Sequence, residues 1–290
     1  MAIAIKWFPP SWIQIKTKFL IIYIDPAYLR TYFTKHPHKI EFSKWPDPID
    51  GLPEKLAKAD MVLLTHDHAD HCKKVTVDRL RKKKTSVYGP KRCLKKIGTG
   101  IRVVVPEEEI FSGEVTIKTT HAYNTPDGSS TQKVHHRGNG VGYLLTAEGK
   151  TIYHAGDTDY IPEMTRLGPV DAALLPIGGT YTMDVGEAVK AAMAIKPKVA
   201  IPIHHLKSNP REFQKASQPN QPAQPGCWRL AKLFSSCETT NILTANRRIS
   251  NIEPQNFEVW NRFAQSFLNR QNTLLRHSIF IIRYSIFAFS

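Results

Sequence analysis

The sequence predicts an α/β fold in which helices pack against β-sheets, and two observations support this prediction. Over residues 1–214, short apolar runs alternate with stretches of helical character, an order typical of sheets covered by helices. The chain has 290 residues, of which 41% are hydrophobic and 22% charged. A chain of this length and composition can bury a sizeable core, as one large domain or two small ones.

The expected strands are short runs rich in β-branched and aromatic residues, each bounded by polar or turn-forming residues. They cover residues 19–25, 61–66, 86–89, 114–120, 141–147, 150–156, 171–178 and 198–205. Two stretches between them have helical character, residues 75–83 and 184–196. The second is rich in alanine and begins at Asp184, a residue type that favours the N-cap position.

The composition changes after about residue 215. Residues 215–227 are rich in proline and glutamine and are typical of a linker, and no aspartate occurs after Asp184. From Lys215 onward there are nine Lys or Arg and three Glu, which supply +6 of the net charge of +15. We therefore expect a domain over residues 1–214, followed by an atypical tail over residues 215–290 that combines a linker with a poorly ordered segment.

The charge and the cysteines limit the kinds of partner and compartment. A net charge of +15 favours anionic partners, although the basic run at residues 79–84 is more typical of a solvated helix end. Four widely spaced cysteines, Cys72, Cys93, Cys227 and Cys237, are no disulfide scaffold, and so we expect a cytoplasmic protein. The apolar C-terminal run is too short for a transmembrane helix and contains Arg283.

Residues 65–71, THDHADH, follow a predicted strand and concentrate groups that bind metals. In extended backbone, residues two apart point the same way, so His66 and His68 can bind one ion. Asp70 and His71 follow the bend and can reach a second ion. Imidazole with carboxylate suits Zn²⁺, Fe or Mn²⁺, and the absence of three thiolates argues against a purely structural zinc.

Further ligand-type residues follow later predicted strands. Asp157 comes just after one strand, where a carboxylate could bridge two ions, and His204 and His205 end another. Residues on loops at one edge of a sheet are typical of a functional site. These turns therefore predict a site for two metal ions.

The HxHxDH run, the GDT at residues 156–158 and the histidine at a late strand end resemble the metallo-β-lactamase superfamily. The stretches YHAGDTDYIPEM, LLPIGGTYTMDVGEA and KPKVAIPIHH further resemble a subgroup of small metal-dependent hydrolases related to the ascorbate-6-phosphate lactonases. The resemblance covers roughly residues 15–214. It implies a four-layer αβ/βα sandwich with the metal site along one edge. The tail departs from the family pattern, and we hypothesise a shifted reading frame.

The resemblance also implies a role for each ligand. The first metal would take His66, His68 and a third histidine, and the second would take Asp70, His71 and His204, with Asp157 bridging the two. For the third histidine we favour His135, which lies 22 residues before Asp157 in a turn similar to that of the family. The alternatives are His121, which ends a strand, and His136.

Such a site implies a binuclear hydrolase that uses a metal-bound hydroxide on a small ester, lactone or phosphodiester. Asp70 would orient the nucleophile and accept its proton. The expected cofactors are two divalent ions, with Zn²⁺ favoured over Mn²⁺ or Fe²⁺, and the expected substrate is a small, anionic molecule. The alternatives are a nuclease acting on RNA or DNA, which the basic charge would suit, and an inactive metal-binding remnant.

Four further residues are candidates, and three of them, His205, Cys72 and Tyr181, have two interpretations each. His205 would orient a ligand or donate a proton, or would lie outside the site. Cys72 is a ligand or a buried thiol, and we favour the thiol. His154 would contact the ligands from outside. Tyr181 precedes the second predicted helix and would line a substrate pocket or pack as an ordinary residue.

Overall fold

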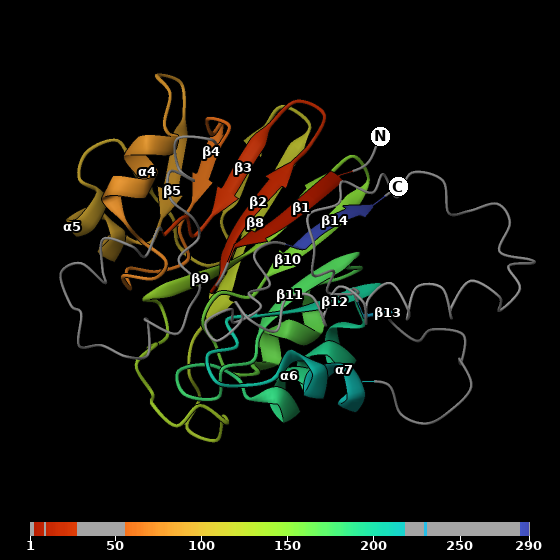
Figure 1. Ribbon diagram of the computed structural model, residues 1–290. Coiled ribbons are helices and arrows are strands. Elements are labelled where there is room, and N and C mark those ends of the chain that lie inside the picture. The colour runs from red at the N-terminus through yellow and green to blue at the C-terminus, as the bar shows by residue number, and fades with distance from the viewer. Residues whose placement is uncertain (1–2, 9, 28–55, 218–228, 231–284, 290) are drawn as a thin grey trace, which may run out of the picture.

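The computed structural model describes residues 3–8, 10–27, 56–217, 229–230 and 285–289. Two mixed sheets pack face to face, and helices cover the outer face of each (Figure 1). This architecture confirms the predicted α/β sandwich. Most of the predicted linker and of the tail lies outside the described residues.

The first sheet has the strand order β14-β1-β2-β3-β4-β5-β6 within the described part of the chain. Its strands from β14 to β3 pair antiparallel, and those from β3 to β6 pair parallel. The bounds are β1 (Ile3–Phe8), β2 (Trp12–Lys16), β3 (Ile21–Ile24), β4 (Met61–Leu63), β5 (Ser86–Gly89), β6 (Arg102–Val103) and β14 (Ser285–Phe289).

The second sheet has the order β13-β12-β11-β10-β9-β8-β7. The strands from β13 to β10 pair parallel, and those from β10 to β7 pair antiparallel. The bounds are β7 (Glu109–Ser112), β8 (Val115–Ala122), β9 (Gly140–Ala147), β10 (Lys150–His154), β11 (Ala172–Pro176), β12 (Val199–Ile203) and β13 (Arg229–Leu230).

The helices belong to the two outer layers (Figure 1). Beside the first sheet are α4 (Lys74–Leu80), the 3-10 turn η1 (Lys91–Cys93) and α5 (Leu94–Ile97), and beside the second are η2 (Pro162–Arg166), α6 (Val185–Ile195) and α7 (Pro210–Ala216). The Asp184 side chain accepts a hydrogen bond from the Glu187 amide at 2.7 Å, which confirms it as the N-cap of α6. No helix in the described ranges is long and apolar enough to cross a membrane.

Three buried apolar clusters hold the four layers together. The largest fills the space between the sheets and includes Ile15, Ile117 and Tyr143. A second joins α6 and η2 to the second sheet, and a third joins α4 and α5 to the first. Because apolar side chains occupy every interface between layers, polar residues are left to the loops at the edges of the sheets.

Each run predicted as a strand overlaps a strand of the structure, but several further strands are not predicted. These include β1, β2 and the short β6 and β7, although β2 alternates apolar with polar residues. The helix predicted over residues 75–83 is α4, which ends at Leu80 because Arg81 is extended (ψ 144°) and the Lys82 amide donates to Thr85 Oγ1. At the predicted domain boundary, α7 runs on to Ala216.

The topology brings polar loops to one edge of the sandwich. Because β3 and β4 are parallel neighbours, Asp25 and His66 follow their ends at the same edge. Similarly, β10 and β12 both run parallel to β11, and Asp157 and His204 follow their ends. Residues that are far apart in the sequence can therefore form one site.

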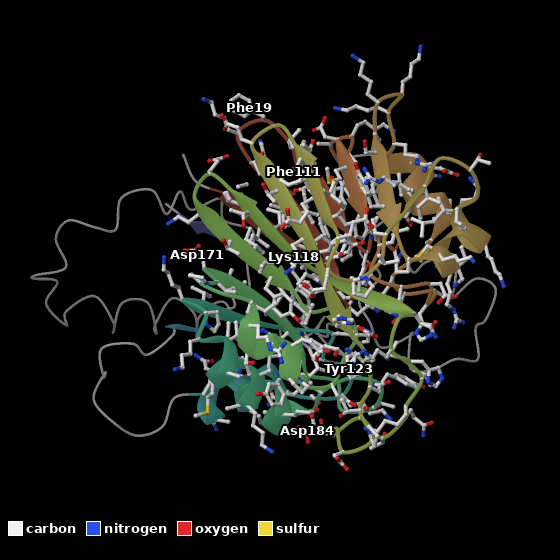
Figure 2. The ribbon with its side chains drawn as sticks, turned by 180° about the vertical axis from the view of Figure 1, so that it is seen from behind. Phe19, Phe111, Lys118, Tyr123, Asp171 and Asp184 are labelled. Carbon is white, nitrogen blue, oxygen red and sulfur yellow. The ribbon has the colours of Figure 1, made fainter. Side chains whose placement is uncertain are left out.

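Asp171 ties together the starting ends of three parallel strands (Figure 2). It accepts hydrogen bonds from the Thr151 amide at 2.8 Å and from Lys198 Nζ at 2.7 Å. Burial acts to raise the pKa of this carboxyl, but the Lys198 and Thr151 hydrogen bonds outweigh it and lower the pKa.

We predict that Asp171→Asn lowers the free energy of unfolding by about 1 kcal/mol at pH 7, measured by urea denaturation. A carboxyl whose pKa is lowered on folding stabilises the protein above its unfolded pKa of about 4, and this contribution is lost as the pH falls through the folded value. The difference between variant and wild type should therefore shrink below pH 4. A difference that is constant between pH 7 and pH 3 would contradict this account.

A candidate metal site at the sheet edge

The predicted ligands converge at this edge. Among the described residues, three groups of histidine and carboxylate donor atoms each lie within 4.8 Å of one another. One group is His66, His68 and His135, and another is Asp70, His71 and His204. These two groups coincide with the sets predicted for the two metals. The third group combines Asp25, His66 and His71.

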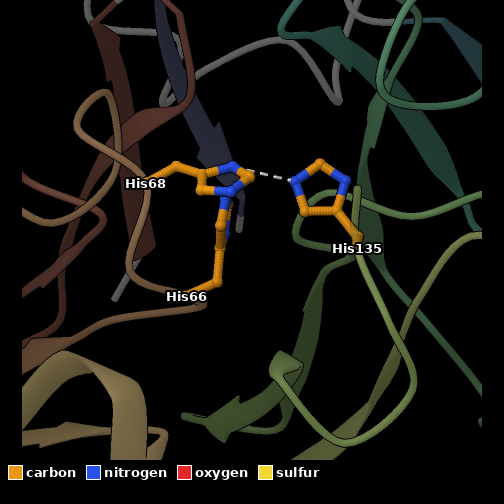
Figure 3. Close-up of side chains that lie close together, drawn as sticks. All are labelled: His66, His68 and His135. Carbon is orange, nitrogen blue, oxygen red and sulfur yellow. Dashed lines mark hydrogen bonds between the residues drawn. The ribbon is translucent and has the colours of Figure 1, made fainter. Parts of the chain in front are cut away.

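The first group joins loops from both sheets. His66 and His68 follow β4, and His135 lies on the loop between β8 and β9. Figure 3 shows the three rings turned toward one another, with His68 Nδ1 at 3.1 Å from His135 Nε2. Of the two alternatives for the third histidine, His136 is exposed and His121 lies on β8, and neither belongs to any of these groups.

Asp157 lies between the two groups. Its Oδ2 atom is 3.4 Å from Nε2 of both His71 and His204, 3.5 Å from His135 Nε2 and 3.8 Å from His66 Nε2. Within the second group, Asp70 Oδ2 lies 3.3 Å from His204 Nε2. One carboxylate oxygen therefore faces imidazoles from both groups, which is the geometry that a bridging ligand requires.

The pKa shifts show that the acidic and basic groups are strongly coupled. Burial acts to raise the pKa of Asp157, but His204 and His71 outweigh it and hold the pKa well below its usual value. In the same way, His71 outweighs burial at Asp70 and lowers its pKa to about 2. Burial acts to lower the pKa of His71 and His204, but the carboxylates raise both. The two buried aspartates are thus stabilised in their ionised form by positive charge beside them.

The donor set fits divalent cations. His66 Nε2 and Asp157 Oδ1 are buried and have no hydrogen-bond partner in the described part of the chain. A buried polar atom without a partner is unfavourable, and coordination of a cation would satisfy both atoms. Burial also lowers the pKa of His66 and His135, which favours the neutral imidazole that binds a metal. Imidazole and carboxylate ligands suit zinc, iron or manganese.

Asp25 fixes the orientation of two of these histidines. Its Oδ2 atom lies 2.7 Å from His71 Nδ1 and 2.6 Å from Thr65 Oγ1, and its Oδ1 accepts from the Thr65 amide at 2.7 Å. Thr65 Oγ1 is in turn 2.9 Å from His66 Nδ1. Because the Nδ1 atoms are held in this way, the Nε2 atoms of both rings face the site.

The loop that carries His135 is held by its own hydrogen bonds. The Asn124 side chain accepts from the His135 amide at 2.8 Å, and His135 Nδ1 donates to the Tyr181 carbonyl at 3.0 Å. Asp159 is fully buried and accepts from the Thr125 and Ser130 amides at 2.9 and 3.2 Å. Tyr181 thus positions His135 through its backbone carbonyl.

The turn before Asp157 requires a glycine. Gly156 has a φ of +68°, and a Cβ there would lie 2.9 Å from the Val141 carbonyl oxygen. Its amide donates to Nδ1 of the buried His154 at 3.1 Å. As expected, His154 acts from outside the ligand groups, by holding the backbone of the turn that presents Asp157.

The remaining candidates lie outside the ligand groups. The centroid of the His205 ring lies 4.9 Å from that of the Trp7 ring. Burial lowers the pKa of His205 to about 4. Cys72 lies in the apolar cluster under α4, as the thiol interpretation predicted. Asp25 and Thr65 are not predicted as functional residues. The signal that could have found them is their position, because each comes at the end of an apolar run that leads to the same sheet edge.

Comparisons with known proteins agree with this geometry. A family model described as a β-lactamase superfamily domain matches residues 26–205. A metal-dependent hydrolase of Thermoplasma acidophilum is 36% identical over an alignment of 174 positions, which covers 56% of this chain and 74% of the relative. A metal-dependent hydrolase of Staphylothermus marinus is 34% identical, and the alignment covers 61% of this chain and 78% of the relative. A solved structure from Parabacteroides distasonis, titled as a metal-dependent hydrolase of putative function, has a TM-score of 0.62 at 30% identity and covers 74% of this chain and 87% of its own.

We predict that Asp25→Asn weakens the binding of a divalent cation by roughly 10- to 100-fold, because His71 Nδ1 would face an amide in place of its acceptor. Asparagine tolerates the φ of +49° at this position, so the backbone turn is preserved. Cation affinity is measured by competition with a chromogenic chelator. Asp78→Asn, on the exposed face of α4, is the matched control. Equal affinities of the two variants would contradict the positioning role of Asp25.

Proposed function

This chain belongs to the metallo-β-lactamase superfamily as a metal-dependent hydrolase, and we propose that it acts through two metal ions on a small ester, lactone or phosphodiester. The observation that carries this proposal is the placement of Asp157 Oδ2 within 3.8 Å of imidazole nitrogens from both ligand groups. The three groups of donor residues all lie between Asp25 and His204, which supports residues 1–214 as the catalytic unit.

In this proposal, His66, His68 and His135 hold one cation, and Asp70, His71 and His204 hold the other, with Asp157 shared between them. When bound, two divalent cations lower the pKa of a water molecule to about 7 and thereby supply hydroxide at neutral pH. Zinc is the cation we favour, since the donors are imidazoles and carboxylates, and manganese and iron accept the same ligands.

Asp70 is the residue we assign to proton transfer. Its side chain is 15% exposed, whereas that of Asp157 is 4% exposed, so Asp70 is the more accessible of the two carboxylates to a reacting molecule. With a pKa of about 2 it is ionised at neutral pH. Its carboxylate oxygens can therefore orient the attacking water and accept the proton that leaves it.

A pocket leads to the first ligand group from outside. Its lining residues are Thr65, His66, Asp67, His68, Arg92, Ala122, Val134, His135, Asn139, Gly140, Val141 and Asp157. Ala122, Val134 and Val141 contribute apolar side chains to the lining, and Asn139 adds an amide. A narrow, partly apolar pocket of this kind favours a small molecule.

We predict that the purified protein contains about two equivalents of zinc, manganese or iron, measured by elemental mass spectrometry. His135→Ala should lose about one equivalent, because it removes a donor from the first group only. His121→Ala is the matched control and should retain both. Retention of both metals by His135→Ala, with a loss in His121→Ala, would assign the third histidine to His121.

The reaction is tested with a panel of p-nitrophenyl esters, lactones and bis-p-nitrophenyl phosphate. We expect metal-dependent hydrolysis by the wild type, abolished by a chelator and restored by adding back the metal. Asp70→Asn should lower kcat by roughly 100-fold or more, because proton transfer at this position is lost. A fully metal-loaded protein that hydrolyses none of these compounds would contradict the proposed substrate classes.

A further inference from the structure

We propose that Arg92 is the specificity-determining residue of this pocket and binds an anionic group, a carboxylate or a phosphate, that the substrate carries beside its scissile bond. The inference deepens the proposed hydrolase and rests on it. It assigns a substrate class, since a substrate with an oxyanion close to the reacting carbon or phosphorus would be preferred over a neutral one.

Arg92 stands at the lip of the pocket. It lies in η1, which directly follows β5, and it shares the pocket lining with His68, Val134 and Asn139. Its side chain is 52% exposed, so the guanidinium is open to a molecule that enters.

A single contact holds the guanidinium over the ligand loop. Arg92 Nε lies 3.2 Å from Asp67 Oδ1, and Asp67 stands between His66 and His68 in the sequence. Among the described residues, Asp67 is the one ion-pair partner of Arg92. Guanidinium presents paired N–H donors in a planar fork that matches the oxygens of a carboxylate or phosphate. The guanidinium is thus held by Asp67 on one side and remains half exposed to an entering ligand.

The charge around Arg92 also favours an anion. Residues 73–102 contain twelve Lys or Arg and a single acid, Asp78, so this segment has a net charge of +11. Lys91, Lys95 and Lys96 are exposed on η1 and α5 beside Arg92. Basic side chains on the segment that carries Arg92 raise the concentration of anions near this part of the surface.

A purely structural role for Arg92 predicts a different behaviour. If the residue only held Asp67 and the ligand loop, its loss would impair the binding of neutral and anionic compounds alike. If it binds an oxyanion, its loss affects only the anionic compound. The comparison of two compounds that differ by one carboxylate therefore separates the two roles.

The kinetic test compares mono-p-nitrophenyl glutarate with p-nitrophenyl valerate, which share the leaving group and the chain length. Arg92→Gln should raise KM for the glutarate ester about tenfold, which is the effect of losing one charge-assisted contact. The kcat for this ester and both kinetic constants for the valerate ester should remain nearly unchanged. Lys84→Gln is the matched control. It removes one charge from the same segment, but Lys84 precedes β5 whereas Arg92 follows it, at the opposite strand end.

A binding measurement decides the matter independently of turnover. Isothermal titration calorimetry of the metal-loaded protein with glutarate and with valerate should show tighter binding of glutarate, and Arg92→Gln should remove this preference. The role of Arg92 would be overturned if the wild type bound both acids equally well or bound neither. It would also be overturned if Arg92→Gln lost affinity for both acids to the same extent. A preference lost with Arg92, in a protein that hydrolyses neither ester, would uphold Arg92 and refute the proposed reaction.

Discussion

The site depends on the burial of negative charge. Asp25 and Asp157 are almost completely shielded from water, and Asp70 is largely so. A buried carboxylate is tolerated only where partners compensate for its lost hydration. The fold surrounds Asp70 and Asp157 with imidazoles, and the shifted pKa values of His71 and His204 show how strongly the carboxylates attract positive charge. This arrangement is suited to hold a divalent cation, as in the proposed function.

The layered core makes the arrangement possible. Apolar clusters fill the space between the sheets and beneath the helices, so the sheets are fixed relative to one another. The site loops lie at the edge, where the chain leaves each strand, and hydrogen bonds to Asp25, Asn124 and Asp159 hold them. The apolar core therefore provides a rigid scaffold, and the loops attached to its edge carry the candidate site residues.

Much of this was predictable from the sequence, because hydrophobic runs and ligand spacing are local signals. The strand before His66 and the N-cap Asp184 follow from such patterns, whereas the two sets of ligand-type residues follow from the family resemblance. The sequence offered several histidines for the third position, and only the folded loop brings His135 beside His68. The sequence predicts Asp25 only as the end of a strand, because its partner His71 lies 46 positions away and their contact leaves no local pattern.

The two ligand groups have a consequence for folding. Each group combines both sheets, because His66, His68, Asp70 and His71 follow β4 of the first sheet, whereas His135, Asp157 and His204 follow strands of the second. A cation held between them acts as a non-covalent cross-link between the N-terminal and C-terminal halves of the sandwich. Ligands that bind only the native state stabilise it by mass action, so free metal concentration would set the melting temperature of the whole domain. Metal supply would then govern the lifetime of the protein in the cell as well as its activity.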